Sequence, residues 1–129
     1  MSGVRAIRPE DVPCYLGAGG RRTRVFLDPA TGHPGLELYH VELPPGASSE
    51  FHARPHPEVL IALEGVAGVE TRDSLHRAAA GTVFWIPAGI EHRHVNAGKG
   101  TAKFLGVFAP PTGHAEQVRK RPRAEEPGP

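Results

Sequence analysis

The sequence lacks several features that would place it in a common class of protein. Cys14 is the only cysteine among 129 residues, so no disulfide can form within the chain. Fifteen basic and 14 acidic residues give a net charge of +1, which provides no strong field for nucleic acid or for a membrane surface. We therefore expect neither nucleic acid nor a membrane as a partner.

Long apolar runs are also missing. The longest uncharged stretch, residues 78–90, is only about 13 residues long and contains Gly81 and Pro87, so it is too short and too interrupted to cross a bilayer. The first residues contain no apolar core of the kind that a secretory signal needs. These absences lead us to expect a cytoplasmic protein.

Glycine, proline and histidine, by contrast, are plentiful. The 16 glycines and 14 prolines make up nearly a quarter of the chain, which is too many for a helical bundle. Apolar residues still account for 39% and alternate locally, so a compact all-β domain with many turns is expected. The eight histidines are the unusual count, because histidine is the commonest metal ligand and general base.

The alternating segments predict a series of short strands separated by turns. They are expected at residues 4–7, 21–28, 36–43, 49–53, 58–63, 66–71, 74–78, 82–86, 91–96 and 102–108. This spacing is typical of a sandwich or barrel. We expect a short N-terminal arm over residues 1–20, a β-barrel over residues 21–109, and a loose, solvated tail over residues 110–129.

A first spaced pattern places three chemically active side chains between two glycines. It reads Gly46-x5-His52-x-Arg54-x3-Glu58-x6-Gly65. His52 and Arg54 share one strand face, because alternate residues of a strand point to the same side. A turn follows them, and it can bring the carboxylate of Glu58 back beside His52.

A second spaced pattern follows about 35 residues later and contributes another histidine. It reads Gly81-x5-Pro87-x-Gly89-x2-His92-x3-Asn96. His52, Glu58 and His92 can then meet inside a barrel. Two imidazoles and one carboxylate form the ligand set of non-haem Fe(II) oxygenases, although Zn and Mn accept such ligands as well.

The two patterns resemble the paired motifs of the cupin superfamily, G-x5-H-x-H-x3,4-E-x6-G and G-x5-P-x-G-x2-H-x3-N. This resemblance implies a small, single-domain, antiparallel jelly-roll β-barrel. It also implies that His52, Glu58 and His92 bind a divalent transition metal, for which we favour Fe(II) over Mn, Zn or Ni. Small cupins commonly form dimers, so a homodimer is expected.

Arg54 is the departure from the family pattern, since it stands where the second histidine of motif one is expected. Arginine does not serve as an ordinary metal ligand. It can clamp an anionic substrate beside a metal, replace the metal by pairing with Glu58, or point to solvent. His56, two residues further on, is a fourth candidate ligand or a turn residue.

Two more histidines are candidates for the cavity. His94 shares strand parity with His92, so it can line the cavity wall or move protons. His40 shares parity with Leu36 and Leu38, which favours an inward position and a role as a base or as a hydrogen-bonded core residue.

The site suits a small molecule that coordinates through oxygen and carries an acidic group. Our first hypothesis is a dioxygenase-type enzyme in which Arg54 orients the substrate and His94 or His40 transfers protons. The alternative enzyme is an isomerase or polyketide-type cyclase that works through a metal-stabilised enolate. A ligand-binding cupin without turnover is the non-enzyme alternative.

Overall fold

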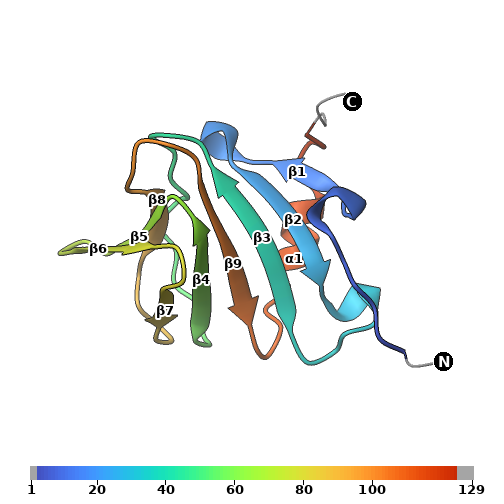
Figure 1. Ribbon diagram of the computed structural model, residues 1–129. Coiled ribbons are helices and arrows are strands. Elements are labelled where there is room, and N and C mark those ends of the chain that lie inside the picture. Colours follow the sequence, from blue (N-terminus) through green and yellow to red (C-terminus); the bar gives the residue numbers. More distant parts are fainter. Residues whose placement is uncertain (1–2, 125–129) are drawn as a thin grey trace.

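The computed structural model describes residues 3–124, and most of its regular secondary structure is β-strand (Figure 1). Nine strands and one α-helix lie within these described residues. The strands are β1 (Cys14–Leu16), β2 (Arg22–Leu27), β3 (Glu37–Leu43), β4 (Glu58–Glu64), β5 (Val66–Glu70), β6 (Leu75–Ala79), β7 (Val83–Ile86), β8 (Arg93–Asn96) and β9 (Ala102–Phe108), and the helix is α1 (His114–Arg119). The all-β class predicted from the sequence is confirmed.

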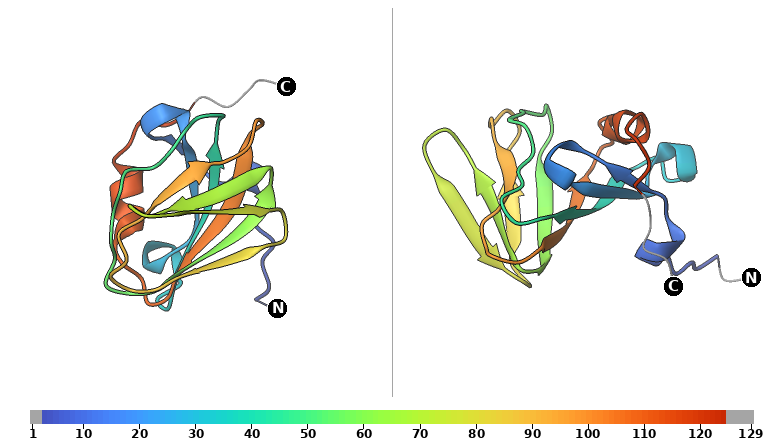
Figure 2. Two further views of the ribbon diagram at one scale, coloured as in Figure 1. Left: turned by 90° about the vertical axis from the view of Figure 1, so that its left-hand side faces the viewer. Right: turned by 90° about the horizontal axis from the view of Figure 1, so that it is seen from above.

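The strands form two antiparallel sheets that face each other (Figure 2). The large sheet has the order β1-β2-β3-β9-β4-β7, and the small sheet has the order β6-β5-β8. Every strand pair is antiparallel, as expected for a jelly roll. Residues 49–53 were predicted as a strand, but the structure has only an isolated β-bridge there, between His52 and His92, the residue that precedes β8. A second isolated bridge joins Ser48 to Val95 of β8.

The inner face of the large sheet carries the core. Alternate residues along β3, β4 and β9 point inward, and the largest of them are almost completely buried. Leu43, Leu60 and Phe104 are each no more than 2% exposed. Gly65 joins β4 to β5 in the left-handed backbone region, and a Cβ at this position would collide with the carbonyl oxygen of Thr101. The motif glycine is therefore required by the turn.

The segment predicted as a loose tail contains an ordered helix over part of its length. Helix α1 is anchored by Glu37, whose buried carboxylate accepts hydrogen bonds from the backbone N–H groups of Thr112, Gly113 and Ala115. Tyr39 donates a further hydrogen bond to the same carboxylate. The prediction is thus corrected for residues 110–124, because a buried acceptor on β3 anchors the beginning of the helix. Residues 125–129 lie outside the described residues.

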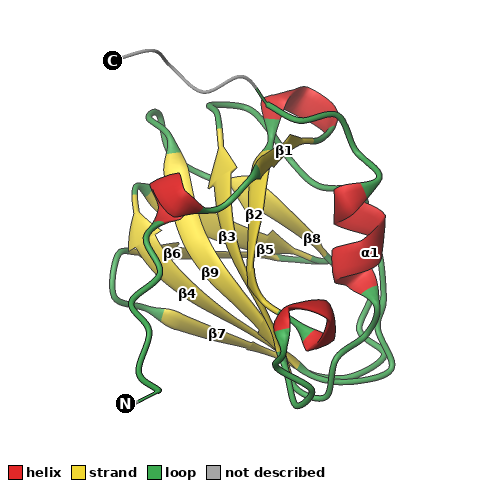
Figure 3. Cartoon of the chain, turned by 90° about the vertical axis from the view of Figure 1, so that its right-hand side faces the viewer, coloured by secondary structure: helices red, strands yellow, loops and turns green. Residues whose placement is uncertain are grey.

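The chain beyond α1 returns to the edge of the large sheet (Figure 3). Leu16 N donates to the carbonyl oxygen of Pro122 at 2.8 Å, and Ala124 N donates to that of Cys14 at 2.8 Å. Strand β1 therefore lies between β2 and the C-terminal segment, although its residues were predicted to belong to an N-terminal arm. These contacts fix the residues that follow α1, which is important for the cavity described below.

A bidentate ion pair also holds α1 against the rest of the fold. We expect its contribution to stability to depend on pH. Arg119 donates to both carboxylate oxygens of Asp28, at 2.7 and 2.8 Å, and this bond lowers the pKa of the 3%-exposed Asp28 side chain. A lowered pKa stabilises the fold above the ordinary carboxyl pKa of about 3.9, and the stabilisation is lost as the pH falls through the folded-state value.

Replacing Asp28 by asparagine should lower the free energy of unfolding by about 1–2 kcal/mol at pH 7, a difference that should be clearly smaller at pH 3. Urea unfolding at both pH values measures this. Asp11→Asn is the matched control, because the Arg8–Asp11 pair lies on the surface and its loss should leave stability unchanged. An Asp28→Asn difference of equal size at both pH values would contradict the assignment.

The other edge of the large sheet is formed by β7, whose outward side chains are apolar. Val83 and Trp85 are 58% and 65% exposed. The homodimer expected from the sequence stays a prediction. No helix among residues 3–124 is long and apolar enough to cross a membrane.

Candidate metal centre

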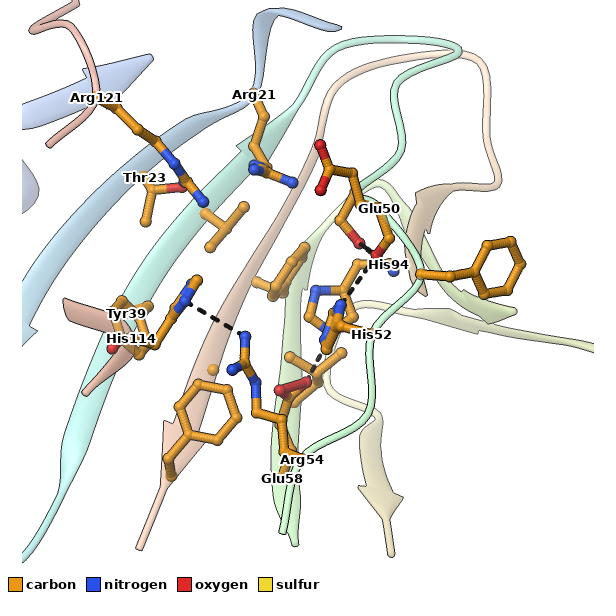
Figure 4. A pocket seen from close by; sticks show the side chains of 17 residues that line it. Arg21, Thr23, Tyr39, Glu50, His52, Arg54, Glu58, His94, His114 and Arg121 are labelled. Atoms are coloured by element: carbon orange, nitrogen blue, oxygen red, sulfur yellow. Dashed lines mark hydrogen bonds and ion pairs between the residues drawn. The ribbon is translucent and has the colours of Figure 1, made fainter. Parts of the chain in front are cut away.

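Four side chains converge between the two sheets. The candidate ligand atoms of His52, Glu58, His92 and His94 all lie within 4.8 Å of one another. Figure 4 shows His52, His94 and Glu58 on one wall of the cavity. The sequence predicted His52, Glu58 and His92 as metal ligands, and the structure brings these three together with His94, which was predicted to line the cavity or move protons.

Backbone pairing explains why the imidazoles meet. His52 and His92 exchange two backbone hydrogen bonds, each 2.9 Å long, so they are direct cross-strand neighbours. Their ring centroids are 4.4 Å apart. His94 follows His92 by two residues and therefore shares its face. Ser49 holds His94 from the facing segment, since Ser49 N donates to the His94 carbonyl oxygen and His94 N donates to Ser49 Oγ, both at 2.8 Å.

In both His52 and His92, the ring nitrogen Nδ1 is hydrogen-bonded to a backbone carbonyl oxygen. Nδ1 of His52 lies 2.9 Å from the carbonyl oxygen of Glu50, and Nδ1 of His92 lies 2.8 Å from that of Ile90. A carbonyl oxygen only accepts hydrogen bonds, so each Nδ1 carries the proton. In the neutral rings, each Nε2 then presents a lone pair to the cluster, which is the orientation that a metal-ligating histidine needs.

Unsatisfied polar atoms provide the test of whether these residues fit a metal ion. Nε2 of His52, Nε2 of His92 and Oε2 of Glu58 are buried and have no hydrogen-bond partner among the described residues. Buried polar atoms without partners are costly, and a cation between them would satisfy all three. Nitrogen and oxygen donors of this kind suit Fe(II), Mn, Zn or Ni. The side chains therefore fit a divalent transition metal.

Electrostatics within the cluster keep Glu58 ionised and His52 neutral, whereas the Glu58 carboxylate outweighs burial and raises the pKa of His92. Burial raises the pKa of Glu58, but the neighbouring His94 and His92 outweigh it and leave the pKa below its ordinary value. Glu58 Oε1 lies 2.6 Å from His94 Nε2 and 3.6 Å from His92 Nε2, the latter beyond hydrogen-bond distance. Burial, together with the charge of His94, lowers the pKa of His52 to about 4. At neutral pH the cluster thus offers a carboxylate and a neutral imidazole.

A cavity of about 170 Å³ opens beside the cluster. His52, Glu58 and His94 line one part of it, and residues from β2, β3, β9 and the segment around α1 line the rest. Gly106 of β9 contributes no side chain to the wall, which leaves room near Leu60. The volume suits a small molecule and not a polymer.

Arg54 lines this cavity. Its guanidinium lies 4.9 Å from the centroid of the Phe108 ring, and Nη2 lies 3.4 Å from Nδ1 of His114. It forms no ion pair with Glu58 within 4 Å among the described residues, and its buried Nε has no hydrogen-bond partner there. This geometry agrees with the substrate-clamp interpretation and disagrees with the other two, in which Arg54 pairs with Glu58 or points to solvent.

The two remaining predicted site residues lie away from the cluster. His40 is on the opposite face of β3, where its ring stacks on Phe26 with centroids 5.8 Å apart. The expectation that it faces inward is corrected, because Tyr39 and Val41, which have the other parity, line the cavity. His56 lies in the turn before β4, outside the four-residue cluster and outside the cavity lining.

Three basic residues of the cavity were not identified from the sequence. Arg21 lies in a predicted strand, and His114 and Arg121 lie in the predicted tail, but none of them was a candidate site residue. Burial, with a further contribution from Arg54, lowers the pKa of His114 to about 3, so the ring is neutral at pH 7 and accepts a hydrogen bond from Arg54. No local pattern marks these residues, since the docking of the C-terminal segment brings two of them to the cavity.

Comparison with protein-family models gives one match, which covers more than half of the chain. A model described as a cupin domain matches residues 39–108. Germin-like protein 1-2 from Oryza sativa subsp. japonica is 28% identical over 99 residues, which are 72% of this chain. The chain spans only 44% of the length of that relative.

Solved structures with the same fold include enzymes. The polyketide cyclase RemF from Streptomyces resistomycificus is 25% identical, with a TM-score of 0.72 over 84% of this chain and 82% of that chain. A predicted oxalate decarboxylase from Thermotoga maritima is 20% identical, with a TM-score of 0.74 over 83% of this chain and 100% of that chain. The second likeness concerns the fold alone.

Proposed function

This chain belongs to the cupin family, and from that premise we propose that it is a metal-dependent enzyme acting on a small, acidic, oxygen-coordinating molecule. The observation that carries the proposal is the set of three buried donor atoms without partners, on His52, Glu58 and His92, beside a cavity. A purely structural role would leave these atoms uncompensated. The likeness to the polyketide cyclase RemF, which is 25% identical to this chain, supports the proposal.

Each side chain of the site has a distinct task in this proposal. His52, His92, His94 and Glu58 hold the metal, and the backbone carbonyls of Glu50 and Ile90 keep the first two rings in the ligating tautomer. A divalent transition metal bound there supplies a Lewis acid for substrate oxygens and, as Fe(II), a centre for reaction with O2. Arg54 binds a carboxylate of the substrate, and neutral His114 orients the guanidinium.

Oxygenation is the reaction that we propose first. Two histidines and one carboxylate are the ligand set of non-haem Fe(II) oxygenases, and His52, Glu58 and His92 provide it with His94 as a fourth candidate. Beyond the cluster, the cavity lining includes the apolar side chains of Leu60, Phe104 and Phe108. Such a lining limits the access of water to reactive species.

Cyclisation or isomerisation is the second candidate, and one observation favours it. The polyketide cyclase RemF is 25% identical to this chain and shares its fold over 84% of the residues. In this case the cluster would polarise a substrate carbonyl and no oxidant would be consumed.

The experiment that separates these candidates is oxygen uptake by protein reconstituted with Fe(II), measured across diketones, catechols, 2-oxo acids and hydroxy acids. Uptake that requires both Fe(II) and one substrate class supports oxygenation. Conversion of a substrate without oxygen uptake supports cyclisation or isomerisation. Binding of these compounds without any conversion would contradict an enzymatic role and favour a ligand-binding cupin.

A further inference from the structure

Two arginines line the cavity away from the metal cluster. Arg21 immediately precedes β2 and Arg121 comes from the segment after α1, and both point into the cavity (Figure 4). We refer to Arg21 and Arg121 as the arginine pair. Among residues 3–124, neither has a carboxylate within the 4 Å of an ion pair. Both side chains are half-buried, so each guanidinium has given up part of its hydration without gaining an acidic partner.

The backbone holds both arginines in place. Gly17 N donates to the carbonyl oxygen of Arg21 at 2.7 Å, and Arg21 N donates to that of Ala18 at 3.3 Å. The guanidinium of Arg21 lies against Gly17, where a Cβ would be 2.9 Å from Nε. Arg121 N donates to the carbonyl oxygen of Val118, a residue that is completely buried. A site built on fixed backbone is preorganised for a ligand.

The charges around the pair leave a positive excess. Burial lowers the pKa of both arginines, and the charge of Arg121 lowers that of Arg21 further. Glu50 is the acid that acts on both of them, and it is exposed. Arg54 adds a third guanidinium, whereas the only other carboxylate in the cavity lining is Glu58 of the cluster. A divalent metal would increase the positive excess, so the cavity requires an anionic occupant.

We propose that the arginine pair is an anion subsite that binds a second carboxylate of the substrate. The substrate is then a small dianion, with one acidic end held by Arg21 and Arg121 and its other end directed to Arg54 and the histidine cluster. A planar guanidinium matches a carboxylate through two parallel hydrogen bonds, and two guanidinium groups from different elements can share one carboxylate. The placement of the substrate's other end beside Arg54 and the histidine cluster rests on the proposed function. The anion subsite at Arg21 and Arg121 does not.

Calorimetric titration of metal-free protein tests the subsite with dicarboxylates and monocarboxylates of equal length. Succinate is compared with butyrate, and glutarate with valerate. We expect one of the dicarboxylates to bind at least about tenfold more tightly than its monocarboxylate partner. Arg21→Gln and Arg121→Gln should each remove most of this preference. Lys120→Gln is the matched control, because this exposed neighbour lies outside the cavity lining, and it should bind as the wild type does.

The arginine variants could lose binding because they unfold, so a variant that keeps every charge serves as a control. Gly17→Ala places a methyl group against the guanidinium of Arg21 and should reduce the dicarboxylate preference, while circular dichroism and thermal unfolding remain as in the wild type. Equal affinity for dicarboxylates and monocarboxylates in the wild type would overturn the subsite. So would a preference that survives in folded Arg21→Gln and Arg121→Gln proteins.

Metal content measured on the same proteins separates this inference from the proposed function. Both arginine variants should take up metal as the wild type does, because neither residue belongs to the cluster. Dicarboxylate binding that depends on the pair, in a chain that takes up no metal, supports the subsite and contradicts the metal-dependent function. Metal uptake without such binding overturns the subsite and leaves the function standing.

Discussion

Glu58→Gln should lower the affinity for a divalent transition metal by about 100-fold or more while the chain still folds. Glu58 is 1% exposed and supplies the only negative charge of the four-residue cluster. Glutamine has the same shape and retains an oxygen that can accept from His94, so the core around β4 should keep its packing. The metal, however, loses its anionic ligand, and even loss of an outer partner of a ligand typically costs 10–100-fold in affinity.

The measurement is metal competition against a chromogenic chelator, using protein purified without a histidine tag. Glu50→Gln is the matched control, because its side chain also lines the cavity but lies outside the cluster. Its backbone carbonyl would continue to hold Nδ1 of His52. Equal metal affinities for Glu58→Gln and the wild type would contradict the assignment of Glu58 as a ligand.

Glu37→Ala should produce the largest loss of stability, about 3 kcal/mol or more in the free energy of unfolding. The Glu37 side chain is fully buried and accepts hydrogen bonds from Tyr39, from the Thr112 hydroxyl and from the backbone at the beginning of α1. Alanine would leave these donors buried without an acceptor. The loss should appear as a lower midpoint in urea unfolding followed by circular dichroism.

Glu116→Ala provides the comparison for Glu37→Ala, since Glu116 is an exposed carboxylate on α1 itself. Its removal should change stability by no more than about 0.5 kcal/mol. Displacing α1 in Glu37→Ala should also move Arg121, so the dicarboxylate preference should fall in this variant even where the protein remains folded. A Glu37→Ala protein as stable as Glu116→Ala would show that the carboxylate does not anchor the helix.

The sequence was sufficient to predict most of the strands and three members of the cluster. Residues 36–43, 58–63 and 102–108 alternate strongly, and β3, β4 and β9 occupy nearly the same ranges. The spacing of the two motifs and their resemblance to cupin motifs identified His52, Glu58 and His92, although His52 and His92 meet only through a long-range β-bridge. His94 follows from strand parity once the inward face of β8 is known.

The rest of the site depends on contacts between distant parts of the chain. Glu37 is a charged residue that a hydrophobic pattern assigns to the surface, but it lies on the inward face of β3 because its carboxylate binds the beginning of α1. That pattern therefore favoured His40 over Tyr39. Helix α1 and Arg121 were missed for the same reason, since a segment rich in proline and charge is ordered here by a buried acceptor more than 70 positions away.

Arg54 shows what the structure adds to a motif. The sequence left three positions open for this side chain, and the structure places it in the cavity beside Phe108 and His114, without an ion pair to Glu58 within the described chain. The histidine missing from motif one is matched by His94, which brings the cluster to three imidazoles and one carboxylate. Arg54 is therefore available to bind an anion next to the candidate metal cluster.

The central claim is that His52, Glu58, His92 and His94 bind one divalent transition metal. Crystals of tag-free protein reconstituted with Fe(II), Mn, Zn or Ni, with anomalous data collected at the edge of the added metal, test it most directly. The account predicts one anomalous peak per chain, about 2 Å from Nε2 of His52 and Nε2 of His92 and from a Glu58 oxygen. Absence of a peak for every one of these metals, or a peak elsewhere with the cluster vacant, would contradict it.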